Sequence, residues 1–275
     1  MKEKSLSVRV TKYIVSYGLA IIWLIPIVWM LFVALSEEGV VITNFVEWFL
    51  PPYSLDSFAA IMFGTRLFRW MFNSFVVASS ATFFVLLTAS MGAFAISIIN
   101  FRFKELVFTL FIIGILVPIQ VNVIPLYNIA QEMGLVNSYA ALALPRIAIP
   151  LGVIILRNFF DSIPKSLIES AKIDGASWFT IYLKIVLPLS QAALAAVGIF
   201  TFIMTWNDFL WPLIITTREV MYTLPVGIPT FLDVFRPDYV IPMTVNMLAA
   251  FPAIVIYLIF QRKIIEGLKM TGIKG

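Results

Sequence analysis

Six apolar stretches, each about as long as the hydrocarbon core of a membrane is thick, constrain this chain more than any other feature. An α-helix needs about 20 apolar residues to cross that core. Because a helix satisfies its own backbone hydrogen bonds in lipid, the stretches predict an all-α integral membrane protein with six transmembrane helices. The stretches lie at residues 13–35, 73–99, 106–126, 139–156, 185–206 and 240–260.

The composition excludes a water-soluble fold. The 275 residues are 61% hydrophobic and 12% charged, whereas a soluble domain must cover its surface with polar groups. Basic residues precede the first stretch, as in a secretory signal, but this stretch is too long for a signal peptide and lacks a clear cleavage site. We therefore expect an uncleaved first helix. The chain contains no Cys and no His, which excludes disulfides and metal or catalytic sites built from those residues.

The basic residues predict an orientation in the membrane. With the N-terminus inside, 14 of the 19 Lys and Arg residues fall in cytoplasmic segments, and Arg146 lies within the fourth stretch. This bias follows the positive-inside rule and predicts that both termini are cytoplasmic. The net charge of +4 is dispersed along the membrane edges, which disfavours nucleic acid as a partner. The external basic residues are Arg66, Arg69, Arg218 and Arg236.

The longest polar interruption in the second half of the chain begins with a predicted helix at residues 164–173. Ser162 is its expected N-cap, Pro164 suits its first turn, and Gly175 suits the stop after its C-terminus. Charged and apolar residues recur at helical spacing on separate faces. The charged face holds Lys165, Glu169 and Lys172, and the apolar face holds Leu167, Ile168 and Ala171.

A second helix is expected directly after this turn. Asp174 can hold the turn by bonding backbone amides, and Ser177 can cap the next helix. Trp178, Phe179 and Tyr182 suit the membrane–water boundary. A rigid helix–turn–helix at a membrane face is a suitable docking element for a soluble partner. An ordinary amphipathic connector would show the same pattern, so both interpretations stay open at this point.

The residues of this segment resemble a known motif. Glu169-Ser170-Ala171-x-x-Asp174-Gly175-Ala176, followed by Tyr182, Ile185 and Leu187-Pro188, resembles the EAA loop of the inner-membrane permeases of ABC importers. Ser170 replaces the usual second Ala, and Tyr182 replaces the usual Phe. The resemblance implies that the ATPase-coupling residues are Glu169, Ser170, Ala171, Asp174, Gly175 and Ala176.

The same resemblance implies an architecture and a set of partners. The fold would be that of a type I ABC importer permease in a prokaryotic inner membrane. Residues 1–72 would form the N-terminal tail, first helix and first external loop, and residues 73–275 the five-helix core with its coupling loop and C-terminal tail. The implied partners are a second homologous permease, two ATP-binding subunits and an extracytoplasmic solute-binding protein. The implied mechanism is alternating access.

A second motif bears on the substrate. Residues 206–212, with the sequence Trp-Asn-Asp-Phe-Leu-Trp-Pro, resemble the matching segment of the carbohydrate-uptake, maltose-type branch of these permeases. The loop at 134–139 resembles that of sugar-importer permeases, whereas the start of the core at Asn73-Ser74-Phe75 and the tail at 266–275 resemble those of the permease family. The resemblance implies a sugar or oligosaccharide substrate, and aromatic rings and amides suit sugar recognition. An interfacial belt would also explain Trp206 and Trp211 without any ligand, and Asn73 would simply cap a helix.

Polar residues beside prolines mark candidate positions along a translocation pathway. Pro118 and Pro125 break the third stretch, and Pro145 and Pro150 flank Arg146 in the fourth. Broken helices with polar groups are tolerated only where they face protein or water. Arg146 either extends outward to the interface or lines the pathway. The candidate pathway residues are Gln120, Asn122, Arg146, Trp206, Asn207, Trp211 and Asn246.

Several kinds of chemistry are missing from the sequence. It holds no phosphate-binding loop, so ATP and Mg²⁺ would be bound by a separate ATPase, and we expect no cofactor on this chain. It also shows no catalytic constellation and no metal site. None of the six stretches contains Asp or Glu, which disfavours a proton-coupled carrier. The alternatives are an ABC permease for a non-sugar solute and a secondary carrier that works without an ATPase.

Overall fold

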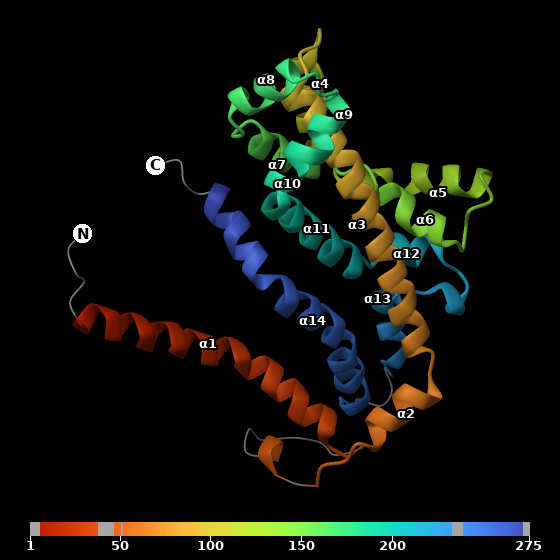
Figure 1. Cartoon of the computed structure of the whole chain (residues 1–275). Coiled ribbons are helices and arrows are strands. Elements are labelled where there is room, and N and C mark those ends of the chain that lie inside the picture. Colours follow the sequence, from red (N-terminus) through yellow and green to blue (C-terminus); the bar gives the residue numbers. More distant parts are fainter. Residues whose placement is uncertain (1–5, 38–46, 51, 233–238, 272–275) are drawn as a thin grey trace. The chain divides into compact units, whose positions relative to one another are not determined.

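The computed structural model describes residues 6–37, 47–50, 52–232 and 239–271, and these residues are almost all helical (Figure 1). Their single β interaction is an isolated bridge between Ser36 and Tyr53. The chain divides into two compact units. The first comprises Met1–Phe68 and Ile228–Phe251, and the second comprises Arg69–Gly227 and Pro252–Gly275.

The first unit is built around the end of α1 (Leu6–Leu35) and the start of α14 (Val240–Thr271). The Thr244 hydroxyl lies 3.1 Å from the Ala34 carbonyl oxygen and 2.8 Å from that of Val240, and so fastens the two helices together. Phe32 packs edge-on against Phe49, with ring centroids 4.8 Å apart. The unit also holds η1 (Glu47–Phe49), α2 (Asp56–Gly64) and η6 (Ile228–Phe231).

The second unit contains the long helix α3 and a succession of shorter helices. The first group after α3 (Leu67–Ile98) is α4 (Lys104–Leu116), η2 (Ile119–Asn122), α5 (Val123–Glu132), α6 (Tyr139–Ala143), η3 (Leu144–Arg146) and α7 (Pro150–Phe160). The second group is α8 (Lys165–Ile173), α9 (Trp178–Ile181), the π-helical turn η4 (Tyr182–Val186), α10 (Leu187–Leu189) and α11 (Gln191–Trp206). The last group is α12 (Leu210–Ile215), η5 (Glu219–Met221) and α13 (Leu224–Gly227).

The six predicted stretches take two different forms in the described residues. Three are continuous helices long and apolar enough to cross a membrane, at Val10–Leu35, Leu67–Ile98 and Val240–Ile259. The other three are pairs of helices joined by a bend, and the number of spans is six if each pair counts as one span. The pairs are Lys104–Leu116 with Ile119–Glu132 at 89°, Tyr139–Arg146 with Pro150–Phe160 at 46°, and Trp178–Leu189 with Gln191–Trp206 at 79°.

Two of these bends divide stretches that were predicted as single membrane-spanning segments, the third and the fifth. The third stretch turns by 89° after α4, where Pro118 prevents the helix from continuing, while Pro125 is accommodated in the first turn of α5. The fifth stretch is not one helix either, because the chain bends by 79° at Ser190. At the bend Ser190 leaves the helical conformation, with φ −101° and ψ 14°.

The core of the second unit lies where α3, α7 and α11 cross. Val85, Ala89, Val153, Leu156 and Val197 are all buried there in one cluster. A Cβ atom on Gly152 would lie 3.2 Å from the Ala89 Cβ and 3.4 Å from a Val197 methyl group. The missing side chain therefore lets the three helices approach closely, as small residues do in membrane bundles.

Candidate functional site

The helix–turn–helix forms where the sequence predicts it. The chain turns at Gly175, which has φ +80°, and the amides of Gly175 and Ala176 donate to the carbonyls of Lys172 (3.1 Å) and Ala171 (2.9 Å). This pair of bonds is a Schellman motif, which satisfies the last carbonyls of α8 and favours Gly at the left-handed position. The predicted stop at Gly175 is confirmed.

Two of the predicted polar contacts around this turn are wrong, and one is confirmed. Ser162 does not cap α8, since its hydroxyl donates to the Phe159 carbonyl (2.6 Å) and Pro164 occupies the N-cap position. The Asp174 side chain accepts no hydrogen bond from the described residues, because backbone bonds close the turn. Ser177 does cap α9, with its oxygen accepting from the Thr180 amide at 3.1 Å.

The charged face of α8 borders a hollow of about 880 Å³. Lys165, Glu169 and Lys172 line it together, as their spacing predicts. Lys172 Nζ lies 4.2 Å from the Trp178 ring centroid and 3.2 Å from the Ala176 carbonyl oxygen. The other lining residues come from the end of α3, the segment before α4 and its first residue, the end of α7, the segment between α7 and α8, α8 itself and the start of α9: Ser97, Ile98, Asn100, Lys104, Phe160, Asp161, Ile163, Ile168, Ile173 and Trp178.

The apolar face of α8 is narrower than predicted. Ile168 and Ala171 pack against the core cluster of the second unit. Leu167 is 43% exposed and Ile173 is 87% exposed, so neither contributes to that packing. The motif residues Glu169, Ser170, Asp174 and Gly175 are exposed, whereas Ala171 and Ala176 are partly buried. Charged and apolar side chains are therefore presented side by side on an accessible turn.

A polar network that the sequence analysis did not predict lies beneath α8. Arg157, in the last turn of α7, contacts Glu105 of α4 at 3.1 Å and Asp161 at 3.5 Å, and its guanidinium carbon lies 3.6 Å from the Phe108 ring centroid. Asp161 accepts a hydrogen bond of 2.6 Å from Ser97 of α3. The i,i+4 spacing of Arg157 and Asp161 signals one contact of the network, but no local pattern signals the other contacts.

Tyr182 is enclosed by protein and does not face a membrane–water boundary. Its side chain is 6% exposed, its hydroxyl is 2.6 Å from the Ser90 hydroxyl, and its ring lies 5.3 Å from that of Phe94. The boundary prediction for this residue is wrong, because its polar tip finds a partner on α3. The helix–turn–helix is thereby fixed to the longest helix of the unit (Figure 1).

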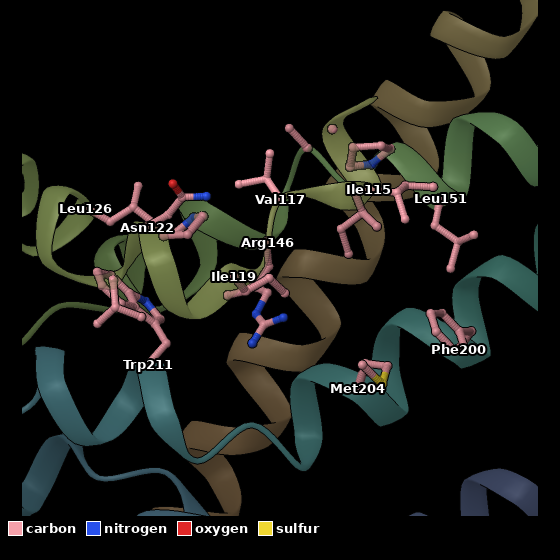
Figure 2. Close-up of a pocket in the computed structure, with 16 residues that line it drawn as sticks. Ile115, Val117, Ile119, Asn122, Leu126, Arg146, Leu151, Phe200, Met204 and Trp211 are labelled. Atoms are coloured by element: carbon pink, nitrogen blue, oxygen red, sulfur yellow. The ribbon is translucent and has the colours of Figure 1, made fainter. Parts of the chain in front are cut away.

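A cavity of about 360 Å³ opens where two helices are broken, and α11 forms one of its walls (Figure 2). Three predicted pathway residues line it, namely Asn122, Arg146 and Trp211. Figure 2 shows Phe200 and Met204 on α11 as part of the same lining. The remaining lining residues are Gly114, Ile115, Val117, Ile119, Val123, Leu126, Pro145, Ala148, Ile149, Pro150 and Leu151.

Arg146 is paired and does not extend outward to the interface. Its Nη2 atom lies 2.5 Å from Asp208 Oδ2, and the two side chains are 12% and 10% exposed. The pair links η3 to the segment that joins α11 and α12. Removing one partner of such a buried pair leaves an uncompensated charge, at a cost of about 3–5 kcal/mol. The sequence analysis treated each residue separately, since the positions between them carry no pattern that connects them.

The tryptophans at both ends of the Trp206–Pro212 segment are buried. Trp206 is 4% exposed and stacks on Phe202 with centroids 5.8 Å apart. Trp211 is 3% exposed, and its indole N–H donates to the Ala141 carbonyl at 2.9 Å. Because tertiary packing encloses both rings, the predicted interfacial belt is wrong for these two residues.

The other predicted pathway residues do not line this cavity. Asn207 donates to the Ile203 carbonyl of its own helix (2.9 Å), and Gln120 is exposed on η2. Asn246 belongs to the first unit and donates to the Pro242 carbonyl (2.8 Å). The structure therefore brings three of the seven predicted residues to one cavity.

Asn73 anchors the segment after α12 and does not cap a helix. It lies inside α3, fully buried, and its amide donates to the carbonyls of Val220 (2.9 Å) and Tyr222 (2.8 Å). It also accepts a hydrogen bond of 2.6 Å from the Tyr139 hydroxyl. The α-helix begins at Leu67, well before the apolar stretch, which moves Asn73 from the predicted end of the helix to its interior.

The comparisons with known proteins identify the family. Residues 85–269 match the family described as binding-protein-dependent transport system inner membrane component. The chain belongs to this family. It is therefore an all-α integral membrane permease, and the matched region contains the whole EAA-like segment.

Two relatives agree with this family assignment. The permease is 31% identical over 260 residues to the arabinooligosaccharides transport system permease protein AraQ of Bacillus subtilis, covering 94% of this chain and 92% of the relative. It is 35% identical over 212 residues to the sn-glycerol-3-phosphate transport system permease protein UgpE of Agrobacterium fabrum, covering 76% and 74%.

The fold is that of an ABC importer. A crystal structure of a bacterial ABC transporter involved in the import of the acidic polysaccharide alginate matches with a TM-score of 0.82 at 19% identity, covering 95% of this chain and 99% of that chain. The predicted permease fold is confirmed.

Proposed function

We propose that this chain is a translocation subunit of an ATP-driven importer for a sugar or an oligosaccharide. The family match carries the proposal, since it extends over most of the chain and places it among inner membrane components of binding-protein-dependent systems. The relationship to AraQ, whose name specifies arabinooligosaccharides, supports the sugar substrate. The Trp206–Pro212 segment supports it independently, by its resemblance to the carbohydrate branch.

The proposed assembly contains a second homologous permease, two ATP-binding subunits and an extracytoplasmic binding protein. ATP and Mg²⁺ would be bound by the ATPases, because this chain has no phosphate-binding loop. The helix–turn–helix at α8 and α9 is the proposed contact with an ATPase, through Glu169, Ser170, Ala171, Asp174, Gly175 and Ala176. The exposed charges and the exposed Ile173 side chain suit a soluble partner.

The proposed mechanism is alternating access. An ATPase that binds α8 differently in its ATP-bound and ATP-free forms shifts the permease between outward-facing and inward-facing states, by as much as those contacts differ in free energy. Ile168 and Ala171 pack α8 against the core cluster of the second unit, the Tyr182–Ser90 contact joins the segment after α9 to α3, and the Arg157 network joins α3, α4 and α7 to one another. They provide a physical route by which movement of α8 would reach the spans.

The proposed function is tested by reconstituting this chain with the gene products encoded beside it. The complex in proteoliposomes should import a labelled sugar from a panel of arabinose-, xylose- and glucose-based oligosaccharides, and only with ATP inside the liposomes and binding protein outside. sn-Glycerol 3-phosphate serves as the non-sugar solute in the same panel. Import of that compound alone would contradict the sugar assignment, and uptake without an ATPase would contradict the importer assignment.

A further inference from the structure

The cavity at the broken helices has mostly apolar walls, and its one charged lining side chain is paired with a residue of opposite charge. Of the residues that line it, Arg146 is the one with a charged side chain, and Asn122 is the one with a side-chain amide. Trp211 has already donated its indole N–H to Ala141, so it offers the cavity only ring surface. A volume of about 360 Å³ falls in the range of small-molecule sites, about 300–1,000 Å³.

The charge of Arg146 is neutralised from behind the wall. Asp208 contacts the guanidinium at 2.5 Å but is not itself a lining residue, and both side chains are largely buried. A cation that faces a cavity alone attracts carboxylate, sulfonate or phosphate groups. An ion pair at 2.5 Å has no net charge, so the attraction of an anionic group to Arg146 is largely offset by its repulsion from Asp208.

We propose that this cavity accepts an uncharged sugar unit, and that the Asp208–Arg146 pair sets this preference by cancelling the one charge in the wall. The inference rests on the proposed function and adds to it the charge class of the substrate. Apolar side chains and the ring of Trp211 suit the C–H faces of a sugar. The Asn122 amide, which offers both a donor and an acceptor, suits a hydroxyl group.

The charge of the cavity can be measured without knowing the sugar. Ile119 lines the cavity and is 52% exposed, so Ile119→Cys supplies a single reporter thiol in a chain without Cys. Its rates of reaction with anionic and cationic methanethiosulfonate reagents of similar size are compared in the reconstituted complex. We expect the ratio of the two rates to stay within about threefold of that of a small free thiol, because the wall carries no net charge.

Substitutions of the pair should then shift this ratio in opposite directions. Asp208→Asn exposes the charge of Arg146 and should raise the anionic-to-cationic ratio about tenfold, while Arg146→Gln leaves Asp208 unpaired and should lower it about tenfold. The double variant should return to the parental ratio. A thiol at Ser177, on the turn between α8 and α9 and outside the cavity lining, should be unaffected by all three variants and serves as the control.

Sugar uptake by the reconstituted complex provides a second test. With the neutral sugar imported by the parent complex, Asp208→Asn should reduce uptake at least fivefold. An unchanged ratio of anionic to cationic reaction rates in both single variants would overturn the proposal. So would a parental ratio that already favours the anionic reagent tenfold. A reporter thiol that no reagent reaches would also overturn it. If the parent imports no sugar at all, the proposed function fails, whereas the thiol ratios still report on the charge of the cavity.

Discussion

At the scale of single residues, Gly175 has a left-handed backbone conformation and belongs to the proposed ATPase-coupling segment. Its φ of +80° is a left-handed conformation that costs other residues about 1–2 kcal/mol, and branched residues more. A cost of about 1.4 kcal/mol changes a population tenfold. Gly175→Val should therefore lower the equilibrium constant for forming the native turn about tenfold and reduce substrate-stimulated ATP hydrolysis in the reconstituted complex, with normal abundance in the membrane.

A second glycine supplies the matched control for this prediction. Gly134 has φ +66° and, like Gly175, would meet nothing within 4 Å if a Cβ were added, so Gly134→Val introduces the same local strain outside the helix–turn–helix. This variant should retain stimulated ATP hydrolysis. Equal losses in both variants would mean that backbone strain acts on the whole permease, and wild-type stimulation in Gly175→Val would remove the turn from the coupling surface.

At the scale of helices, the Arg157 network makes a prediction because its members differ in burial. The Arg157 side chain is 13% exposed and lies over the Phe108 ring, whereas Glu105 is 74% exposed. The exposed ion pair contributes less than about 1 kcal/mol, but the ring contact and the buried stem of Arg157 contribute about 2 kcal/mol. Arg157→Ala should lower the midpoint of thermal unfolding in detergent clearly more than Glu105→Ala. The reverse order would show that the ion pair, and not the packing, joins α4 to α7.

Local elements were predictable where a few neighbouring residues determine them. The turn at Gly175 and the cap at Ser177 follow from residue type at fixed spacing, and the break at Pro118 follows from a missing amide. The bend at Ser190 was missed because hydropathy predicts one continuous stretch across this position. The Arg146–Asp208 pair was missed because it joins residues that are far apart in the sequence. The burial of Trp206 and Tyr182 was missed because side-chain preference for an interface is weaker than tertiary packing.

At the scale of the whole molecule, length and hydrophobicity were sufficient to predict the class of the protein. Hydropathy counts apolar residues without regard to direction, so it found the six segments but not the fact that three of them are bent by 46–89°. Residues on both sides of two of these bends, those after Leu116 and after Arg146, line the cavity. The candidate site thus depends on departures from straight helices, which the periodicity of a sequence does not encode.

The orientation in the membrane is the last prediction, and it follows from the distribution of basic residues. Leu55 is 66% exposed in the segment expected outside, and Ser177 is exposed on the turn expected in the cytoplasm. In this chain without Cys, Leu55→Cys should react with a membrane-impermeant thiol reagent added to intact cells, and Ser177→Cys should react only after the membrane is opened. Because both thiols are accessible to water in the folded chain, a difference in labelling reports the side of the membrane and not burial. Reaction of Ser177→Cys in sealed cells would place α8 outside, where no ATPase could contact it, and the proposed coupling would fail with the orientation.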